Sequence, residues 1–466
     1  MPFPEEAKKM AEKIEPQVNK PLHFTSDVKN EKTSSCNGSA QKFRVVVIIS
    51  ILLWGLLWPR ISSNVSNLSQ SIMTGKVIHT IPDPLYGFLH FESKNSAFNN
   101  HTFAVDFAGV YFIVRNFDKN DIYSGNYDPR GPIVYSPGML YFYKKTFCRM
   151  PFGVAAVAHL GFQVVLLLLS TIFILRYYKL SMMIVPVSLL YAVLITCSPV
   201  GLAWFERGQF DVYAAIALLF FVFGVYESKG YAFALAALFA AFKLTIAVIF
   251  IQGFIIYLWM GSHKVKWKFS SMFAGIFLFA FILFPKKLPG FFMCLQKVQN
   301  SPQGLTLVNK LPASVCGAIP VFCVLLFLLL VFFARDKESA LRKFFLPYMT
   351  GLAGLNLLLL ANNSEYRIMC CLGFIPLMFV WFFRLCKDRW YCCGTMACFF
   401  LFLLTVFHSL WFLGLDVVSW DDLILAYIAY YLAIVLVSFS RVIPMISSAK
   451  ESCDCLNGKA RSSGIR

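Results

Sequence analysis

The sequence predicts an all-α polytopic membrane protein with about ten full spans, a re-entrant helix pair and a large first outer loop. Of the 466 residues, 58% are hydrophobic and only 14% are charged, whereas a soluble domain carries roughly 25% charged residues. The long apolar runs have the length of helices that cross a ~30 Å hydrocarbon core. They do not alternate between polar and apolar residues as barrel strands do, so helices are predicted.

Two polar tails flank the transmembrane domain, which we place at residues 43–440. Residues 1–42 are polar and charged and predict a disordered cytosolic tail. The first apolar run, 43–58, starts too late for a cleavable signal peptide, so we expect a signal anchor. Residues 441–466 predict a basic cytosolic tail.

Basic residues in short loops predict the orientation of the spans. The formal net charge of +18 would suggest nucleic acid as a partner in a soluble protein. Here the short basic loops are expected to stay cytosolic, and no nucleic-acid partner is expected. The first span then places residues 59–149 outside as a polar loop. The remaining full spans are predicted at 152–175, 181–198, 211–226, 269–284, 314–333, 344–361, 368–383, 390–413 and 422–440.

Residues 231–260 form an apolar segment that is too long for one span and too short for two. Basic residues on both flanks predict that both ends are cytosolic, so one full crossing would break the positive-inside pattern. Broken helices at membrane depth are tolerated where they line a cavity. The sequence therefore predicts two half-helices that meet near Lys243.

The first outer loop carries two candidate site residues. Asp106 is a lone carboxylate at the head of an apolar, helix-like run. It is suited to act as a general base at the membrane interface, or it complements the dipole at a helix N-terminus. Tyr135 lies in a proline-rich segment, 128–137. This segment is either a rigid, extended entry to the next helix or an ordinary loop in which the prolines only mark turns.

Further polar side chains are expected on the same outer side. The turn at residues 206–211 reads Glu-Arg-Gly-Gln-Phe-Asp, and its Arg207 either grips a phosphate oxygen or pairs with a neighbouring carboxylate. Lys243 has no acidic neighbour between residues 233 and 253, so it must snorkel or meet an anion. Arg367, at an outer helix start, either contacts phosphate or belongs to a capped helix end.

One carboxylate and several cations at a shared outer site indicate a specific chemistry. The cations hold a phosphate while the carboxylate takes a proton from an attacking hydroxyl, because charge develops on both groups during displacement. No metal or other cofactor is predicted. The cysteines lie mostly in apolar runs, where they act as small hydrophobes, and none has zinc-site spacing.

These motifs, in this order, resemble the GT-C glycosyltransferases. Asp106 in the first outer loop, Tyr-Ser-Pro at 135–137, Arg-Gly-Gln-Phe-Asp at 207–211 and Lys243 in a broken alanine-rich helix are similar to the polyprenol-phosphate-mannose-dependent mannosyltransferases. The GPI mannosyltransferase I family is similar too. That family has Asp-X-Asp at this place, and in this chain Ala104 stands in the position of the first aspartate and Asp106 in that of the second. The recognisable part covers residues 100 to 260.

The resemblance implies a GT-C bundle that transfers a hexose, with mannose expected, from a polyprenyl-phosphate sugar to a lipid or glycan acceptor with inversion. Asp106 would be the base. The residues expected to bind substrate are Tyr135, Arg207, Gln209, Asp211, Lys243 and Arg367. A lipid-linked glycan polymerase or ligase and a lipid or sugar flippase or transporter remain alternatives. Membrane lipids are expected partners, and either a bacterial inner membrane or the endoplasmic reticulum would fit.

Overall fold

A computed structural model describes the chain at residues 104–119, 122–124, 134–259, 263–300, 303–304, 306–332, 337–360, 362–363, 365–386, 388–407 and 422–441, with a few single positions between 62 and 73. The predicted tail 1–42, the predicted first span 43–58 and the predicted tail 441–466 beyond Arg441 lie outside the described residues. Of the predicted outer loop 59–149, residues 104–119, 122–124 and 134–149 are described, together with the single positions between 62 and 73.

Helices form nearly all of the described part, as the sequence predicts. The elements are α4 (Val105–Arg115), α5 (Pro137–Lys145), η1 (Phe147–Arg149), α6 (Phe152–Tyr177), η2 (Ser181–Met183), α7 (Ile184–Thr196), α8 (Pro199–Arg207), α9 (Asp211–Glu227), α10 (Gly230–Ala240), η3 (Leu244–Ile246), α11 (Ala247–Trp259), α12 (His263–Ile282), η4 (Pro285–Lys287), α13 (Leu288–Gln299), β1 (Gln303–Gly304), α14 (Ala313–Phe332), α15 (Lys337–Leu358), β2 (Asn362–Asn363), η5 (Glu365–Gly373), α16 (Phe374–Val380), η6 (Trp381–Leu385) and α17 (Arg389–Val406), followed by the helix Asp422–Arg441. The two short strands pair in parallel.

Several of these helices are long and apolar enough to cross a membrane. Five qualify singly: α6, α14, the continuous run Tyr366–Leu385, α17 and Asp422–Arg441. Two bent pairs raise the number to 7 if each pair is one span. The described part is thus compatible with a multi-pass membrane protein, and the count of about ten spans expected from the sequence is not reached within it.

The bent pairs correct two predicted boundaries. The predicted span 181–198 ends at Thr196, and α8 continues at an angle of 72° to it. Ser198 caps α8 by accepting from the Gly201 N–H, and Pro199 occupies the first turn, where its missing N–H costs nothing. The predicted loop 285–313 contains α13, which is bent by 74° from α12.

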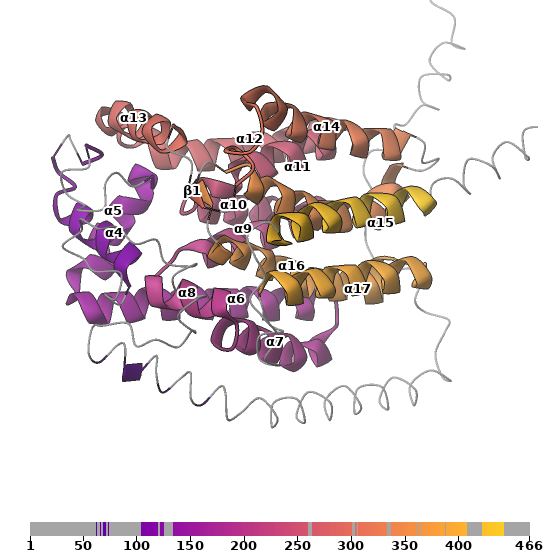
Figure 1. Ribbon diagram of the computed structural model, residues 1–466, viewed down its shortest axis with the longest axis horizontal. Coiled ribbons are helices and arrows are strands. Elements are labelled where there is room, and N and C mark those ends of the chain that lie inside the picture. Colours follow the sequence, from indigo (N-terminus) through magenta and orange to yellow (C-terminus); the bar gives the residue numbers. More distant parts are fainter. Residues whose placement is uncertain are drawn as a thin grey trace, which may run out of the picture. The chain divides into compact units, whose positions relative to one another are not determined.

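The centre of the bundle is α9. All of its residues from Asp211 to Tyr226 are buried, as expected for a helix that is hydrophobic all round. It contacts α6, α10 and η5. The long helices run nearly side by side in Figure 1, with α4, α5, α8 and α13 at one end (left).

The segment that was predicted to be re-entrant folds back on itself. Helices α10 and α11 are separated by a break at residues 241–243. The ring of Phe233, early in α10, lies 5.6 Å from the ring of Tyr257, late in α11. The chain therefore runs along α10 to Lys243 and turns back along α11, so the two short helices form the predicted hairpin.

Candidate functional site

The turn from α8 to α9 supplies the centre of the site. Gly208 has a φ of +68°, a left-handed conformation that favours glycine. A Cβ there would lie 2.9 Å from the Cβ atoms of Ala104 and Phe107. The Ala104 N–H donates to the Glu206 carbonyl at 2.7 Å. This close approach docks the start of α4 onto the turn.

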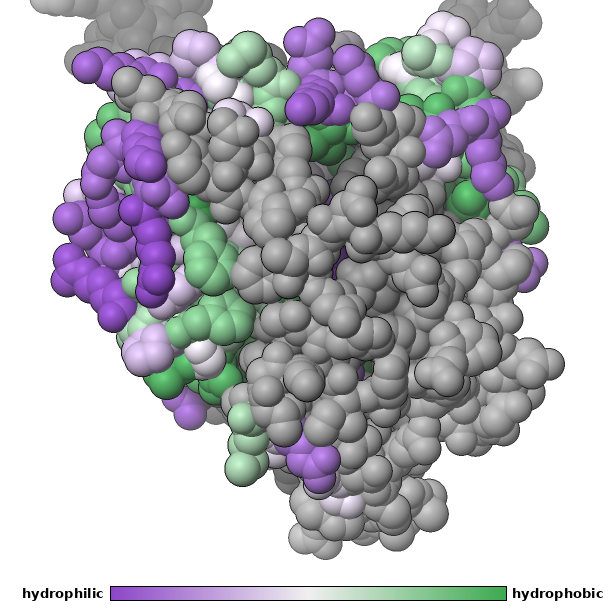
Figure 2. Space-filling view, turned by 60° about the vertical axis from the view of Figure 1, so that its left-hand side comes forward, coloured by the Kyte–Doolittle hydropathy of each residue, from purple (hydrophilic) through white to green (hydrophobic). Residues whose placement is uncertain are grey.

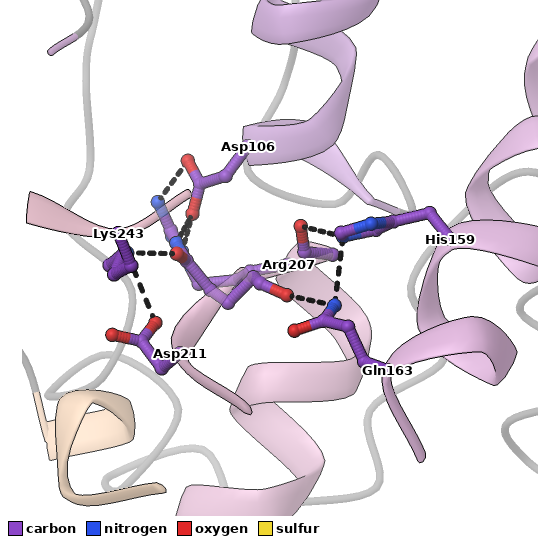
Figure 3. Close-up of polar contacts among 8 residues, drawn as sticks. Asp106, His159, Gln163, Arg207, Asp211 and Lys243 are labelled. Carbon is purple, nitrogen blue, oxygen red and sulfur yellow. Dashed lines mark hydrogen bonds and ion pairs between the residues drawn. The ribbon is translucent and has the colours of Figure 1, made fainter. Parts of the chain in front are cut away.

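Asp106 points from the first turn of α4 at two side chains of that turn (Figure 3). Arg207 donates from Nε to Oδ2 at 2.6 Å and from Nη2 to Oδ1 at 3.0 Å. Gln209 donates from Nε2 to Oδ2. The Asp106 and Arg207 side chains keep 16% and 15% of their surface exposed, so this forked ion pair lies at the edge of the buried interior.

Lys243 lies deeper and joins the same network. Its Nζ lies 3.2 Å from Asp211 Oδ2 in an ion pair, and it donates to Gln209 Oε1 at 3.4 Å. Both Lys243 and Asp211 are almost fully buried. The Gln209 amide thus links the two ion pairs, since its nitrogen faces Asp106 and its oxygen faces Lys243.

The two remaining sequence-predicted residues also border Lys243. The Tyr135 ring lies 5.8 Å from Lys243 Nζ and 4.8 Å from the Phe210 ring. Arg367 lies close enough to Lys243 for their positive charges to repel. The Arg367 Nε has no hydrogen-bond partner within the described residues. The fold therefore gathers all seven predicted side chains around one turn.

Sequence reasoning missed two buried polar residues beneath that turn, His159 and Gln163 of α6. Gln163 Nε2 donates to the Gln209 carbonyl at 2.8 Å, and His159 Nε2 lies 3.3 Å from the Gly208 carbonyl. These contacts hold the backbone from which Arg207 and Gln209 project (Figure 3). Two polar residues spaced i, i+4 in an apolar span are a signal that sequence reasoning could have used.

His159 also connects the turn to α5 and α9. Its Nε2 lies 3.1 Å from the Gln163 amide nitrogen as well as 3.3 Å from the Gly208 carbonyl. Its Nδ1 is hydrogen-bonded to the Tyr143 hydroxyl at 2.7 Å. The Tyr143 hydroxyl is in turn hydrogen-bonded to the Tyr213 hydroxyl at 3.0 Å. This buried chain fixes α5, α6 and α9 relative to one another.

The charges suit binding of an anion beside a carboxylate. Two carboxylates of the site have cationic partners, because Asp106 pairs with Arg207 and Asp211 with Lys243. Arg367 adds a third cation within electrostatic range of Lys243. No group of three or more His, Cys, Asp or Glu side chains in the described part of the chain has the arrangement of a metal site.

Comparison of the chain with protein-family models and with curated protein sequences finds no match. The site's own geometry must therefore support any functional conclusion.

Proposed function

We propose that this protein is an integral membrane glycosyltransferase of the GT-C type. It would transfer a hexose, with mannose as the expected sugar, from a polyprenyl-phosphate donor to a lipid or glycan acceptor. One observation supports this most: Asp106 and Lys243 both contact Gln209, and Arg207 binds Asp106, so side chains from three separate segments form one connected network. A carboxylate beside clustered cations is what transfer from a phosphate-linked sugar needs.

The proposed orientation places this network at the outer side of the membrane. Basic residues gather at the other end of α9, where Glu227 accepts from the Tyr177 hydroxyl and the Lys179 carbonyl accepts from Arg384. By the positive-inside rule that end is cytosolic. In this orientation α10 and α11 form the re-entrant pair, about ten spans complete the bundle, and Lys243 faces the outer leaflet.

In the proposed reaction Asp106 is the base and the displacement inverts the anomeric carbon. The acceptor O–H bond breaks as its proton moves to Asp106, and the acceptor oxygen forms a bond to the anomeric carbon. The bond from that carbon to the phosphate oxygen breaks, and the polyprenyl phosphate leaves with the electron pair. Lys243 and Arg367 stabilise the negative charge on the leaving phosphate.

Arg207 orients the base in this mechanism. Its fork reaches both carboxylate oxygens of Asp106, which sets the plane of the group. Gln209 also donates to Oδ2, so three N–H groups of the turn hold the Asp106 carboxylate in place.

The decisive test is Asp106→Asn, assayed in purified, lipid-reconstituted protein with labelled polyprenyl-phosphate mannose as donor. We expect no transfer and normal membrane insertion, because the amide keeps the shape of the group but is not a base. Asp422→Asn, at an exposed helix start, is the matched control and should remain active. Full transfer by Asp106→Asn would disprove the proposal. Transbilayer movement of labelled donor without transfer would instead indicate a flippase.

A further inference from the structure

Helix α13 packs against Tyr123, a buried aromatic side chain that also contacts the segment carrying Tyr135. An added Cβ at Gly290 would lie 3.4 Å from the Tyr123 Cβ, so the backbone of α13 comes directly against this residue. The ring of Phe291, the next residue of α13, lies 5.6 Å from the Tyr123 ring at an interplanar angle of 74°. This edge-to-face contact is a favoured arrangement of two aromatic rings. The inner face of α13 therefore rests on Tyr123.

Tyr123 in turn holds the backbone at Tyr135. Its hydroxyl donates to the Tyr135 carbonyl at 2.7 Å. The next residue, Ser136, caps α5 and donates from Oγ to the Ala241 carbonyl at 2.6 Å. Ala241 lies two residues before Lys243, and the Tyr135 ring lies 5.8 Å from Lys243 Nζ. A continuous series of contacts thus runs from α13 to the candidate site.

Further contacts fix the start of α13. Pro285 begins η4 directly after α12. Just before it, the Phe284 ring lies 5.2 Å from the Phe117 ring. Lys287, at the end of η4, donates from Nζ to the Lys119 carbonyl at 2.8 Å. These contacts attach the bend between α12 and α13 to the residues that follow α4, so packing sets the direction in which α13 leaves α12.

The outer face of α13 is apolar and exposed. Phe292 is 58% exposed and Met293 is 66% exposed, and the last turn of α12 also exposes Ile282. Exposed apolar side chains therefore occur on both sides of the bend. Lys297 follows one turn after Met293. Figure 2, which turns the end with α4, α5 and α13 forward, shows hydrophobic surface directly beside hydrophilic surface.

Lipid is the surrounding for which this outer face is suited. Helices α12 and α13 together have the length and hydropathy of one membrane span. They are bent by 74° from each other, so α13 lies close to the membrane plane if α12 crosses the membrane. A helix in that plane with Phe and Met on one face and Lys beside them is typical of the boundary between headgroups and acyl chains.

We propose that α13 lies in the membrane interface with Phe292 and Met293 among lipid acyl chains, and that this contact keeps Tyr135 in place at the candidate site through Tyr123. Acyl chains take the two exposed side chains out of water, which holds α13 in one position. Because the inner face of α13 packs on Tyr123, a displaced α13 loosens the hydrogen bond to the Tyr135 carbonyl. The membrane surface thereby regulates the order of the site. The inference rests on the proposed membrane orientation and does not need glycosyl transfer.

The first measurement maps lipid contact in the full-length protein. The protein is placed in phosphatidylcholine vesicles that contain a photoreactive phosphatidylcholine, with the reactive group near the glycerol end of an acyl chain. Labelled positions are mapped by mass spectrometry, and we expect label on Phe292 and Met293. Absence of label on α13 would overturn the proposal. So would a lysine cross-link that joins Lys297 of two copies, because a second copy would then cover this face.

The second measurement follows hydrogen exchange at residues 134–146 in the same vesicles. Tyr123→Phe removes the hydroxyl but keeps the ring against Phe291, and exchange at 134–146 should rise about 5-fold, as for the loss of one ordinary hydrogen bond. Phe292→Gln/Met293→Gln should also raise exchange there, because α13 loses its lipid contact. The matched control, Trp390→Gln/Leu425→Gln, replaces two exposed apolar side chains of other helices and should leave 134–146 at the wild-type rate.

Wild-type exchange at 134–146 in either Tyr123→Phe or Phe292→Gln/Met293→Gln would contradict the link between α13 and Tyr135. Faster exchange throughout the helices would show instead that the double variant is misfolded. Met293→Gln alone then decides the matter, because that side chain is largely exposed and its replacement leaves the inner face of α13 unchanged. Neither measurement contains a sugar donor, so a negative result here is distinct from a negative result in the transfer assay.

Discussion

Arg207 binds both carboxylate oxygens of Asp106, although 101 positions separate the two residues in the chain. The contact joins the first turn of α4 to the last turn of α8. The two hydrogen bonds fix the orientation of the Asp106 carboxylate, which would otherwise rotate freely. Several expected outcomes depend on this geometry.

Arg207→Lys should lower the transfer rate while keeping the fold. A lysine retains the charge but cannot bind both oxygens in one plane, and a misplacement of ~1 Å at a reacting group costs roughly 100-fold in rate. The measurement is kcat for transfer, with thermal unfolding as a check on folding. A variant with wild-type kcat would show that the fork does not orient the base.

Gly208→Ala should destabilise the protein and reduce transfer together. The left-handed φ and the 2.9 Å approach to Ala104 and Phe107 leave no room for a Cβ. The expected cost is about 1–3 kcal/mol, as for other strained backbone positions. Thermal unfolding in detergent measures it. Gly161→Ala is the control, because nothing lies within 4 Å of its added Cβ, and this variant should unfold at or above the wild-type temperature.

Lys243→Met should destabilise the fold by about 3–5 kcal/mol, because it leaves Asp211 charged and buried without its ion-pair partner. Adding Asp211→Asn should recover most of that loss, since the amide needs no counter-charge. Thermal unfolding of the two single variants and the double variant gives the coupling. We expect the double variant to remain inactive in transfer, because the proposed phosphate contact is gone. Recovered transfer would remove Lys243 from the donor site.

Acid should weaken the contact between α15 and α17 that Lys343 makes with Asp388. Burial alone would raise the pKa of Asp388, but the Tyr391 N–H and the Lys343 ammonium outweigh it and bring the pKa below its ordinary value of 3.8. A depressed folded-state pKa means that the stabilisation is complete above about pH 4 and is lost as pH falls through the folded-state value.

Asp388→Asn should therefore unfold more easily near neutral pH and show a smaller further loss below pH 4 than the wild type. Unfolding temperatures measured between about pH 3 and pH 7 test this. Equal acid sensitivity in the two proteins would mean that other carboxyl groups dominate the acid response.

The hydrophobic pattern correctly predicted that the apolar segments are helices, but it did not predict where these helices bend or break. Runs such as 152–175 and 314–333 correspond to α6 and α14 with small boundary changes. Helices α8 and α13 were not predicted, because a polar turn and a lysine-rich loop are ordinary features between spans. The bends have a local cause, because Pro199 and Pro285 each start a new helix. The directions of the new helices depend on packing.

The sequence alone identified the turn 206–211 and the break at Lys243 as candidate site segments, because charged residues in apolar surroundings are costly and usually functional. It did not show which of these charged residues form ion pairs. Asp106 meets Arg207, and Asp211 meets Lys243, only because α4 docks on Gly208 and because α10 returns the chain to the start of α9. Composition and the length of the apolar runs predicted helices, and the described part is compatible with a multi-pass membrane protein. The tertiary structure decided which distant charges neutralise each other, since that choice depends on contacts between segments far apart in sequence.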